Sequence, residues 1–127
     1  MPKPWKLAEL PFLVGIPVPC LDNEGKQVPE ALMQEWVGKA VIELTACFGG
    51  ATPLKAPSRN VVGGRVLHEK DQMLVLSGCP SHADFLRKRR RIVEFAKRMG
   101  EAMSQYAVFV LAFASHSFLV IDEQRAT

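Results

Sequence analysis

The stretch PEALMQEWVGKAVIELTACFGG, residues 29–50, predicts one amphipathic helix together with both of its ends. Apolar side chains recur in it at helical spacing, which is typical of a helix with one buried face. Pro29 suits the first helical position and Glu30 the positive end of the helix dipole. Gly49 and Gly50 then end the helix, because glycine readily adopts the left-handed conformation found at helix C-termini. The apolar arc consists of Leu32, Trp36, Ala40, Leu44 and Cys47, broadened by Met33, Val37, Val41 and Phe48.

On the N-terminal side of this helix, residues 11–20 are apolar and interrupted by prolines. This composition favours an extended segment that ends at the turn DNEG, residues 22–25. Pro17 and Pro19 lack the N–H group that a central strand donates to its neighbour. We therefore expect either a short strand, about Pro11 to Ile16, or a strand that pairs on one side only. Residues 1–10 are expected to form a polar arm.

On the C-terminal side of the helix, residues 51–62 carry Pro53 and Pro57. A strand there belongs at a sheet edge, since proline interrupts the hydrogen bonds of a central strand. Gly63-Gly64 predicts a hairpin turn, after which residues 65–78 are expected to return as a strand.

The second half of the chain predicts one more helix and one more strand. Ser81, followed three residues later by Asp84, forms a capping box that opens a helix over 82–104. Residues 106–121 are expected to form the last strand, bent near Ser115-His116.

The order strand, helix, strand, strand, helix, strand predicts an α+β, ferredoxin-like βαββαβ fold. In this arrangement an antiparallel sheet carries both helices on one face. We expect one domain over residues 11–121, preceded by the arm and followed by a tail over residues 122–127.

The turn after the first helix and the following hairpin resemble a family of small bacterial proteins of unknown function with a ferredoxin-like fold. The family carries an F-G-G-x-T turn before a hairpin of the pattern G-G-x-V-x-x-E, and the likeness covers residues 11–121. The matching positions are Phe48, Gly49, Gly50 and Thr52, then Gly64, Val66 and Glu69. An aromatic residue of the family is absent before the hairpin, where this chain has Asn60 and Val61. The resemblance implies a fold and supplies no function.

Composition excludes several classes of protein. The 127 residues, 48% of them hydrophobic, fit one globular domain of ~100–150 residues. A net charge of +3 is too small to indicate a nucleic-acid partner by itself. Cys20, Cys47 and Cys79 are an odd number without a close pair, so we expect free thiols in a reducing cytoplasm. The apolar residues 106–121 are too few, and too polar at 115–117, to span a bilayer. No cofactor is indicated.

The predicted sheet is apolar on both faces, which indicates self-association. In the last strand Ala107, Phe109, Leu111 and Phe113 alternate with Val108, Val110, Ala112 and Ala114. A sheet face in contact with water would alternate apolar and polar residues instead. We therefore expect a homodimer or higher oligomer that packs through the sheet face uncovered by helices, because an exposed face of this kind exceeds what monomers usually tolerate. The alternative is that the N-terminal arm or residues 51–62 fold over this face.

The second helix carries a basic run, and most of it falls opposite the apolar arc. The residues concerned are Arg87, Arg90, Arg91, Lys97 and Arg98. Such a run is typical of a solvated helix face. The alternative is a surface for nucleic acid or an acidic partner, but no RNA-recognition aromatic pair and no glycine-rich nucleic-acid loop accompany it.

Arg89 is the exception, since helical projection places it within the apolar arc. Its aliphatic part could lie along the apolar surface and place the guanidinium at the sheet edge. Alternatively, the guanidinium could pair with Glu69, with Glu43 or with the acid group of a ligand. A small-molecule site is therefore predicted near the sheet interface, and an anionic ligand would suit it. Its candidate residues are Arg89, Glu69, His68, His116 and Glu43.

The histidines and cysteines give no specific motif. His68 and Glu69 are neighbours on a strand and so point to opposite faces. Cys79, His82 and His116 could bind a metal, but their spacing matches no zinc pattern, so no metal site is predicted. There is no nucleophile elbow, phosphate loop or paired-carboxylate motif. A small enzyme of the dimeric α/β barrel type, transferring protons with His or Glu, remains an alternative on fold analogy alone.

Overall fold

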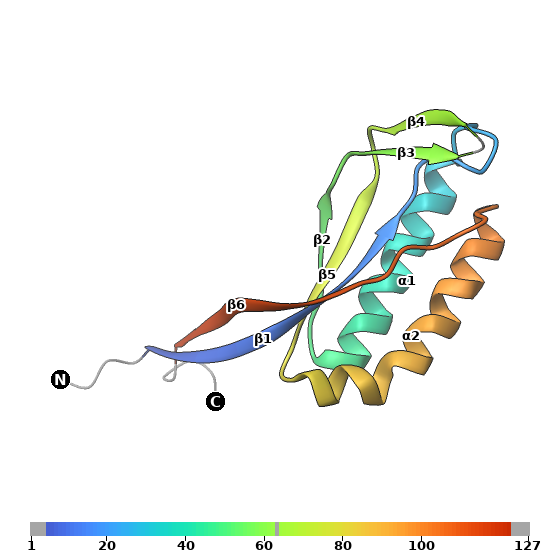
Figure 1. Cartoon of the computed structure of the whole chain (residues 1–127). Coiled ribbons are helices and arrows are strands. Elements are labelled where there is room, and N and C mark those ends of the chain that lie inside the picture. Colours follow the sequence, from blue (N-terminus) through green and yellow to red (C-terminus); the bar gives the residue numbers. More distant parts are fainter. Residues whose placement is uncertain (1–4, 63, 123–127) are drawn as a thin grey trace.

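The computed structural model describes residues 5–62 and 64–122. Within these ranges it does not describe the side chains of Trp5, Asn60, Val62, Arg65, residues 116–119 and Ile121. The elements in order are β1 (Trp5–Val18), α1 (Glu30–Phe48), β2 (Thr52–Lys55), β3 (Ser58–Val62), β4 (Arg65–Glu69), β5 (Met73–Cys79), α2 (His82–Ala102) and β6 (Leu111–Asp122). The main sheet has the antiparallel order β2-β5-β1-β6. Both helices lie on one face of this sheet (Figure 1). The ferredoxin-like α+β fold is therefore confirmed.

The segment expected to be one strand over residues 65–78 is two strands, and that expectation was wrong. β4 pairs only with β3, as a separate two-stranded hairpin, and β5 joins the main sheet. Met73–Leu76 are apolar and fit a central strand, whereas β4 ends in the polar residues His68 and Glu69. The hairpin is thus an insertion between the two strands β2 and β5 of the simple ferredoxin-like order.

The prolines of β1 lie where its pairing is interrupted. β1 is central, but its pairing with β6 ends at the Gly15–Leu111 pair, so Pro17 faces only Leu74 of β5. Neither expectation for this segment holds in full: β1 is longer than Pro11 to Ile16 and is paired on both sides over Phe12–Gly15, while only its last three residues pair with β5 alone. The register also shifts between Leu10–Ser117 and Phe12–Ala114. Pro11 on β1 and Ser115-His116 on β6 lie at this shift, where a bend was expected.

The core fills the space between the helices and one sheet face. β1 contributes Val14, Ile16 and Val18, and β5 contributes Val75 and Cys79; the helices contribute Met33, Trp36, Val37, Ala40 and Leu44 of α1 and Ile92, Phe95 and Met99 of α2. In the described part of the chain, no helix is long and apolar enough to cross a membrane.

The expected helix ends are present. Gly49 has a φ of 92° and its N–H donates to the carbonyl of Thr45. The hydroxyl of Ser81 accepts from the N–H of Asp84 at 3.1 Å, so the capping interaction at the start of α2 is confirmed.

The sheet face away from the helices, here called the open face, is also apolar. Its residues alternate with the buried ones along the strands and are Leu13, Leu54, Leu74, Leu76, Leu111 and Phe113. Gly15 lets three of these leucines converge: a Cβ there would lie 3.1 Å from Cδ1 of Leu74, 3.3 Å from Leu76 and 3.4 Å from Leu111. An apolar open face was predicted and is present, but the last strand begins at Leu111 rather than at residue 106, so residues 107–110 lie outside the sheet faces to which they were assigned.

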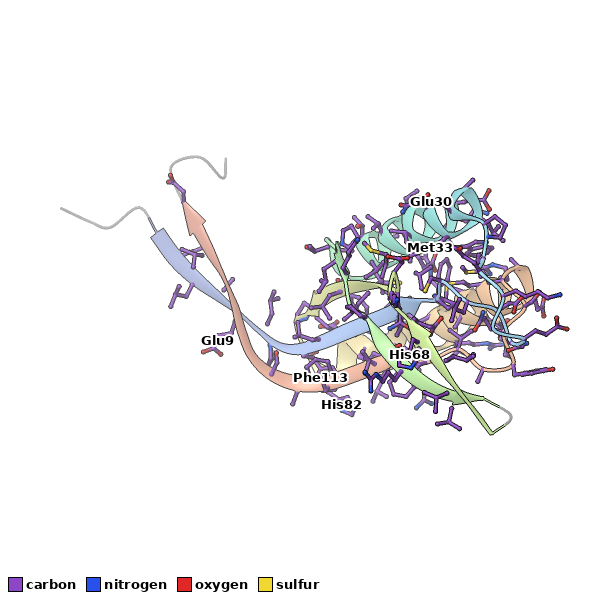
Figure 2. All side chains as sticks on the ribbon, turned by 90° about the horizontal axis from the view of Figure 1, so that it is seen from above. Glu9, Glu30, Met33, His68, His82 and Phe113 are labelled. Atoms are coloured by element: carbon purple, nitrogen blue, oxygen red, sulfur yellow. The ribbon has the colours of Figure 1, made fainter. Side chains whose placement is uncertain are left out.

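Beyond the sheet, β1 and β6 continue as a two-stranded ribbon made of residues 5–10 and 117–122. β5 pairs with β1 only from Phe12 onward, so in the ribbon β1 pairs with β6 alone. Figures 1 and 2 show the ribbon extending away from the sheet and helices. The expectation of a polar arm over residues 1–10 is thus wrong for residues 5–10, which are strand; residues 1–4 lie outside the described residues.

Candidate functional site

A cavity of about 620 Å³ lies between the hairpin of β3 and β4 and one end of the main sheet. This is the end remote from the ribbon (Figure 1). Its walls come from four places: the end of β1 with the following turn, the base of the hairpin, the start of β5, and the segment between α2 and β6. The residues the walls contribute include Pro17, Pro19, Leu21, Asp22, Asn23, Ala56, Pro57, Ser58, Val61, Leu67, Glu69, Gln72, Leu74, Gln105, Tyr106, Phe109 and Leu111. The volume is in the usual range for small-molecule sites, ~300–1,000 Å³.

Glu69 is the buried charged residue of this cavity. It is the last residue of β4, and only 6% of its surface is exposed. Its Oε1 accepts hydrogen bonds from the backbone N–H groups of Cys20 and Leu21, each at 3.2 Å. The carboxylate therefore ties the end of the hairpin to the turn that follows β1. Burial, and also the nearby negative charge of Glu69, raises the pKa of the Cys20 thiol.

Gln72 holds the base of the hairpin. Its Nε2 donates to the carbonyl of Ala56 at 3.0 Å, and its Oε1 accepts from the hydroxyl of Ser58 at 3.2 Å. Its backbone carbonyl also accepts from the N–H of Ala56 at 2.9 Å. Together with the bonds of Glu69, these contacts fix the hairpin over the cavity at both of its strands.

The segment after α2 closes a third wall and is fixed to the same turn. Gln105 Nε2 donates to the carbonyl of Leu21 at 2.7 Å, and Asn23 N–H donates to the carbonyl of Ser104 at 3.0 Å. The side chain of Asn23 in turn accepts from the N–H of Tyr106. These bonds hold the backbone at Tyr106, while its ring stays 83% exposed beside the cavity. Phe109, 68% exposed, lies on the same wall.

The charges of the cavity are acidic. Asp22 and Glu69 line it, and its described lining contains no lysine, arginine or histidine. A carboxylate in such a site repels anions and attracts cations or hydrogen-bond donors. The cavity therefore favours a neutral or cationic ligand, in contrast to the anionic ligand that the sequence led us to expect.

Arg89 does not line this cavity. It is exposed on α2, thirteen residues before the last helical residue Ala102, which corresponds to ~20 Å along the helix axis. Its two expected carboxylate partners are engaged elsewhere. Glu69 binds the turn after β1, and Glu43 accepts from Nε of Arg91 at 2.6 Å. The sequence placed Glu43 on the inward side of α1. Its partner, however, is Arg91, which lies at the edge of the buried side of α2, next to the buried Ile92.

The histidines do not join Glu69. His68 is exposed on the hairpin, where Figure 2 labels it, while its neighbour Glu69 is buried, as strand alternation predicts. The ring of His82 lies tilted against the ring of Phe12, with the centroids 5.1 Å apart. The side chain of His116 lies outside the described part of the structure, so its position relative to Glu69 and His68 is not described.

The candidate metal ligands Cys79 and His82 have other neighbours. The thiol of Cys79 is fully buried and donates to the carbonyl of Ser81 at 3.1 Å. His82 is exposed at the start of α2. Among the residues that the structure describes, no group of three or more His, Cys, Asp or Glu side chains could hold a metal ion.

Much of the basic run on α2 is paired within the chain. Arg87 binds Asp84, Lys97 lies 3.3 Å from Glu94, and Arg91 binds Glu43 across the helices. The guanidinium of Arg98 lies 5.9 Å from the ring centre of Phe95. Arg90 is exposed on the same helix. These contacts reduce the charge that the surface can offer to a phosphate backbone.

Four residues of the site were not singled out from the sequence: Asn23, Gln72, Gln105 and Tyr106. They come from three connecting segments that are far apart along the chain, and none belongs to a spaced motif. The DNEG turn was a partial signal, because Asx side chains often bond the backbone of a turn. Here Asp22 accepts from the N–H groups of Glu24 and Lys26, each at 2.9 Å.

No protein-family model matches the chain, and neither does any curated protein. Among solved structures, a phage SAM lyase in complex with S-methyl-5'-thioadenosine is similar, with a TM-score of 0.58 and 17% identity over 94% of each chain. The divalent cation tolerance protein Cut A1 from Thermus thermophilus gives a TM-score of 0.46 and 14% identity, over 80% of this chain and 81% of that chain. Identities this low concern the fold alone. The ferredoxin-like fold that the sequence resemblance implied is therefore supported, and no match shows the uncharacterised bacterial family itself.

Proposed function

We propose that the chain is a self-associating protein that binds a small neutral or cationic organic molecule in the cavity beneath the hairpin. The observation that carries this proposal is the buried carboxylate of Glu69 in the cavity wall. Apolar pockets with a few fixed polar groups are the usual form of small-molecule sites. Glu69 would accept a hydrogen bond from a hydroxyl or amino group of the ligand, or balance a positive charge.

The walls suggest a ligand that contains a ring system. Tyr106 and Phe109 offer exposed aromatic faces beside the cavity, and Leu67, Leu74 and Leu111 offer apolar contact. Aromatic faces bind flat rings and cations favourably. The ligand in the phage SAM lyase structure, S-methyl-5'-thioadenosine, is a neutral molecule with a ring system and hydroxyl groups. It is therefore a suitable first probe.

Self-association through the open face is the second part of the proposal. Leu54 and Phe113 leave 39% and 43% of their surfaces exposed on the open face, which is mostly apolar. Burying one side chain of this size gains roughly 1.5–3 kcal/mol, so a homodimer or higher oligomer would gain considerably. The three described cysteines are free, which is consistent with the cytoplasmic location that we propose.

A proton-transfer enzyme is the second candidate, favoured by the same carboxylate. A buried glutamate in contact with a bound ligand can act as a general base. Incubation of each probe with the protein, followed by mass spectrometry of the mixture, distinguishes turnover from binding.

Isothermal titration calorimetry with three adenosine compounds tests the proposed binding. S-methyl-5'-thioadenosine is neutral, S-adenosylmethionine carries a sulfonium cation, and adenosine 5'-monophosphate is an anion. We expect the first two to bind and the monophosphate to bind at least ~10-fold more weakly. Glu69→Gln should weaken binding roughly 10- to 100-fold, since a hydrogen bond to a charged group contributes ~1.5–3 kcal/mol.

The control is Glu35→Gln, because Glu35 lies on the exposed side of α1, paired with Lys39 at 3.2 Å. It should leave binding unchanged. Equal affinity of the wild-type protein and Glu69→Gln for every probe that binds would remove Glu69 from the site. Tighter binding of the monophosphate would contradict the proposed ligand charge, and binding of none of the three would contradict a ligand of this class.

A further inference from the structure

The ribbon of residues 5–10 and 117–122 exposes apolar surface that no described part of its own chain covers. Leu7 and Val120 form a cross-strand pair, so both side chains are on one face of the ribbon. They are 64% and 55% exposed. A two-stranded ribbon without further packing is at best marginally stable in water. Its persistence as regular strand therefore calls for a surface to pack against.

The charges of the ribbon indicate a protein as that surface. The described part carries Lys6, Glu9 and Asp122, which gives no basic excess. Nucleic acids and anionic membranes are recognised by clusters of basic residues. The ribbon face with Leu7 and Val120 also carries Glu9 and Asp122, so its charge is acidic and it fits a protein surface rather than a polyanion.

Such a surface is present on the same molecule but out of reach of its own ribbon. The open face lies on the body of the sheet, and the ribbon extends away from that body (Figures 1 and 2). Leu7 precedes Leu13, the first described open-face residue of β1, by six residues, or ~20 Å of strand. The ribbon of a second copy can reach what the chain's own ribbon cannot.

The available area limits the strength of such a contact. A ribbon ~20 Å long and two strands wide presents about 200 Å² on each side, and four strands of the open face over the same length present about 400 Å². A stable interface needs ~800 Å² from each partner. A ribbon covers only about its own area on the open face, so a reciprocal contact buries about 400 Å² from each copy, and we expect an oligomer that dissociates on dilution.

We propose that the ribbon of each copy packs on the open face of another copy of this chain. The proposal rests on the self-association proposed above and adds the segment that makes the contact. Leu74 and Leu111 belong to both the open face and the cavity wall. The ribbon of the second copy would therefore lie next to the ligand cavity and extend its wall.

Sedimentation velocity over a range of protein concentrations tests this proposal. We expect the wild-type protein to form one oligomer. Leu7→Asp and Val120→Asp should each raise its dissociation constant on the order of 100-fold, because a carboxylate would enter an apolar contact. Both residues are exposed in the single chain, so the variants should keep the circular dichroism spectrum of the wild type. The matched control is Ile42→Asp on α1, where Ile42 is 70% exposed, and it should stay oligomeric.

The outcomes separate the two proposals. If both ribbon variants remain oligomeric while Phe113→Asp on the open face dissociates, self-association stands and the role of the ribbon is overturned. A wild-type monomer at every concentration overturns both. Hydrogen exchange in the unmodified chain gives a second measurement, without substitution. The amides of residues 5–10 should exchange faster on dilution to the monomer, and a rate independent of concentration contradicts the proposal.

Discussion

Replacing Glu69 by alanine should destabilise the protein even in the absence of any ligand. Its Oε1 accepts from the N–H groups of Cys20 and Leu21, and the Cys20 amide belongs to a buried residue. A buried N–H that loses its acceptor costs ~1–3 kcal/mol. The Leu21 amide is less deeply buried and can be partly hydrated, so we expect Glu69→Ala to cost about 2–4 kcal/mol in total. For a chain of this size that corresponds to a fall of roughly 10 °C in Tm.

Glu69→Gln keeps an oxygen at the same position and should cost about 1 kcal/mol or less. Urea unfolding followed by circular dichroism measures both variants, with equal m-values as the check that unfolding stays two-state. A loss below about 0.5 kcal/mol in Glu69→Ala would refute the structural role of these bonds. An equal loss in both variants would also refute it, because the glutamine retains the acceptor. The contrast matters for function, since the glutamine variant should be folded and yet impaired in binding.

Three further predictions follow from individual contacts. Gly49→Ala should cost about 1 kcal/mol in urea unfolding, because Gly49 has a φ of 92° and open space around it, whereas Gly50→Ala should change little; equal losses would contradict the assignment. Arg91→Ala should lower the urea midpoint in dilute buffer and lower it less in 1 M NaCl, since it removes an ion pair between the exposed Arg91 and the partly buried Glu43; a loss unchanged by salt would contradict this. Burial raises the pKa of Cys47 above its ordinary value of 9.0, so the unfolded chain releases this proton first. The contribution of the Cys47 thiol to stability is complete below about pH 9 and is lost as the pH rises through its folded-state pKa. The Tm of Cys47→Ala should therefore fall less than the Tm of the wild-type protein between about pH 8 and pH 10.5. An identical fall in the two proteins would contradict this.

The helix ends and the two-layer core were predictable because their causes are local. The period of apolar residues in α1, Gly49 at its end, and the Ser81 cap of α2 each act within a few residues. The bend of the last strand could be anticipated for the same reason. Its polar Ser115-His116 lies where the register with β1 shifts.

The ribbon and the separate hairpin could not be predicted, since they depend on which strands pair. Residues 5–10 become strand because β6 supplies a partner more than a hundred residues away. β4 and β5 separate because β5 is sandwiched between β1 and β2 in the sheet, and nothing in the segment 65–78 alone specifies that partner.

The candidate site was predictable in one residue only. Glu69 was singled out, and it lies in the cavity wall. Arg89 was expected beside it because helical projection indicates only which side of a helix a residue occupies. It does not indicate which end of the sheet that side faces. Asn23 and Gln105 belong to connections whose approach depends on the finished fold.

Native mass spectrometry of gently purified protein at low salt is the most direct test of a Glu69-centred ligand site in a self-associated chain. We predict an oligomer that carries a small neutral or cationic adduct, and the same oligomer without the adduct in Glu69→Gln. A monomer without an adduct, or a complex with nucleic acid, would contradict the proposed function.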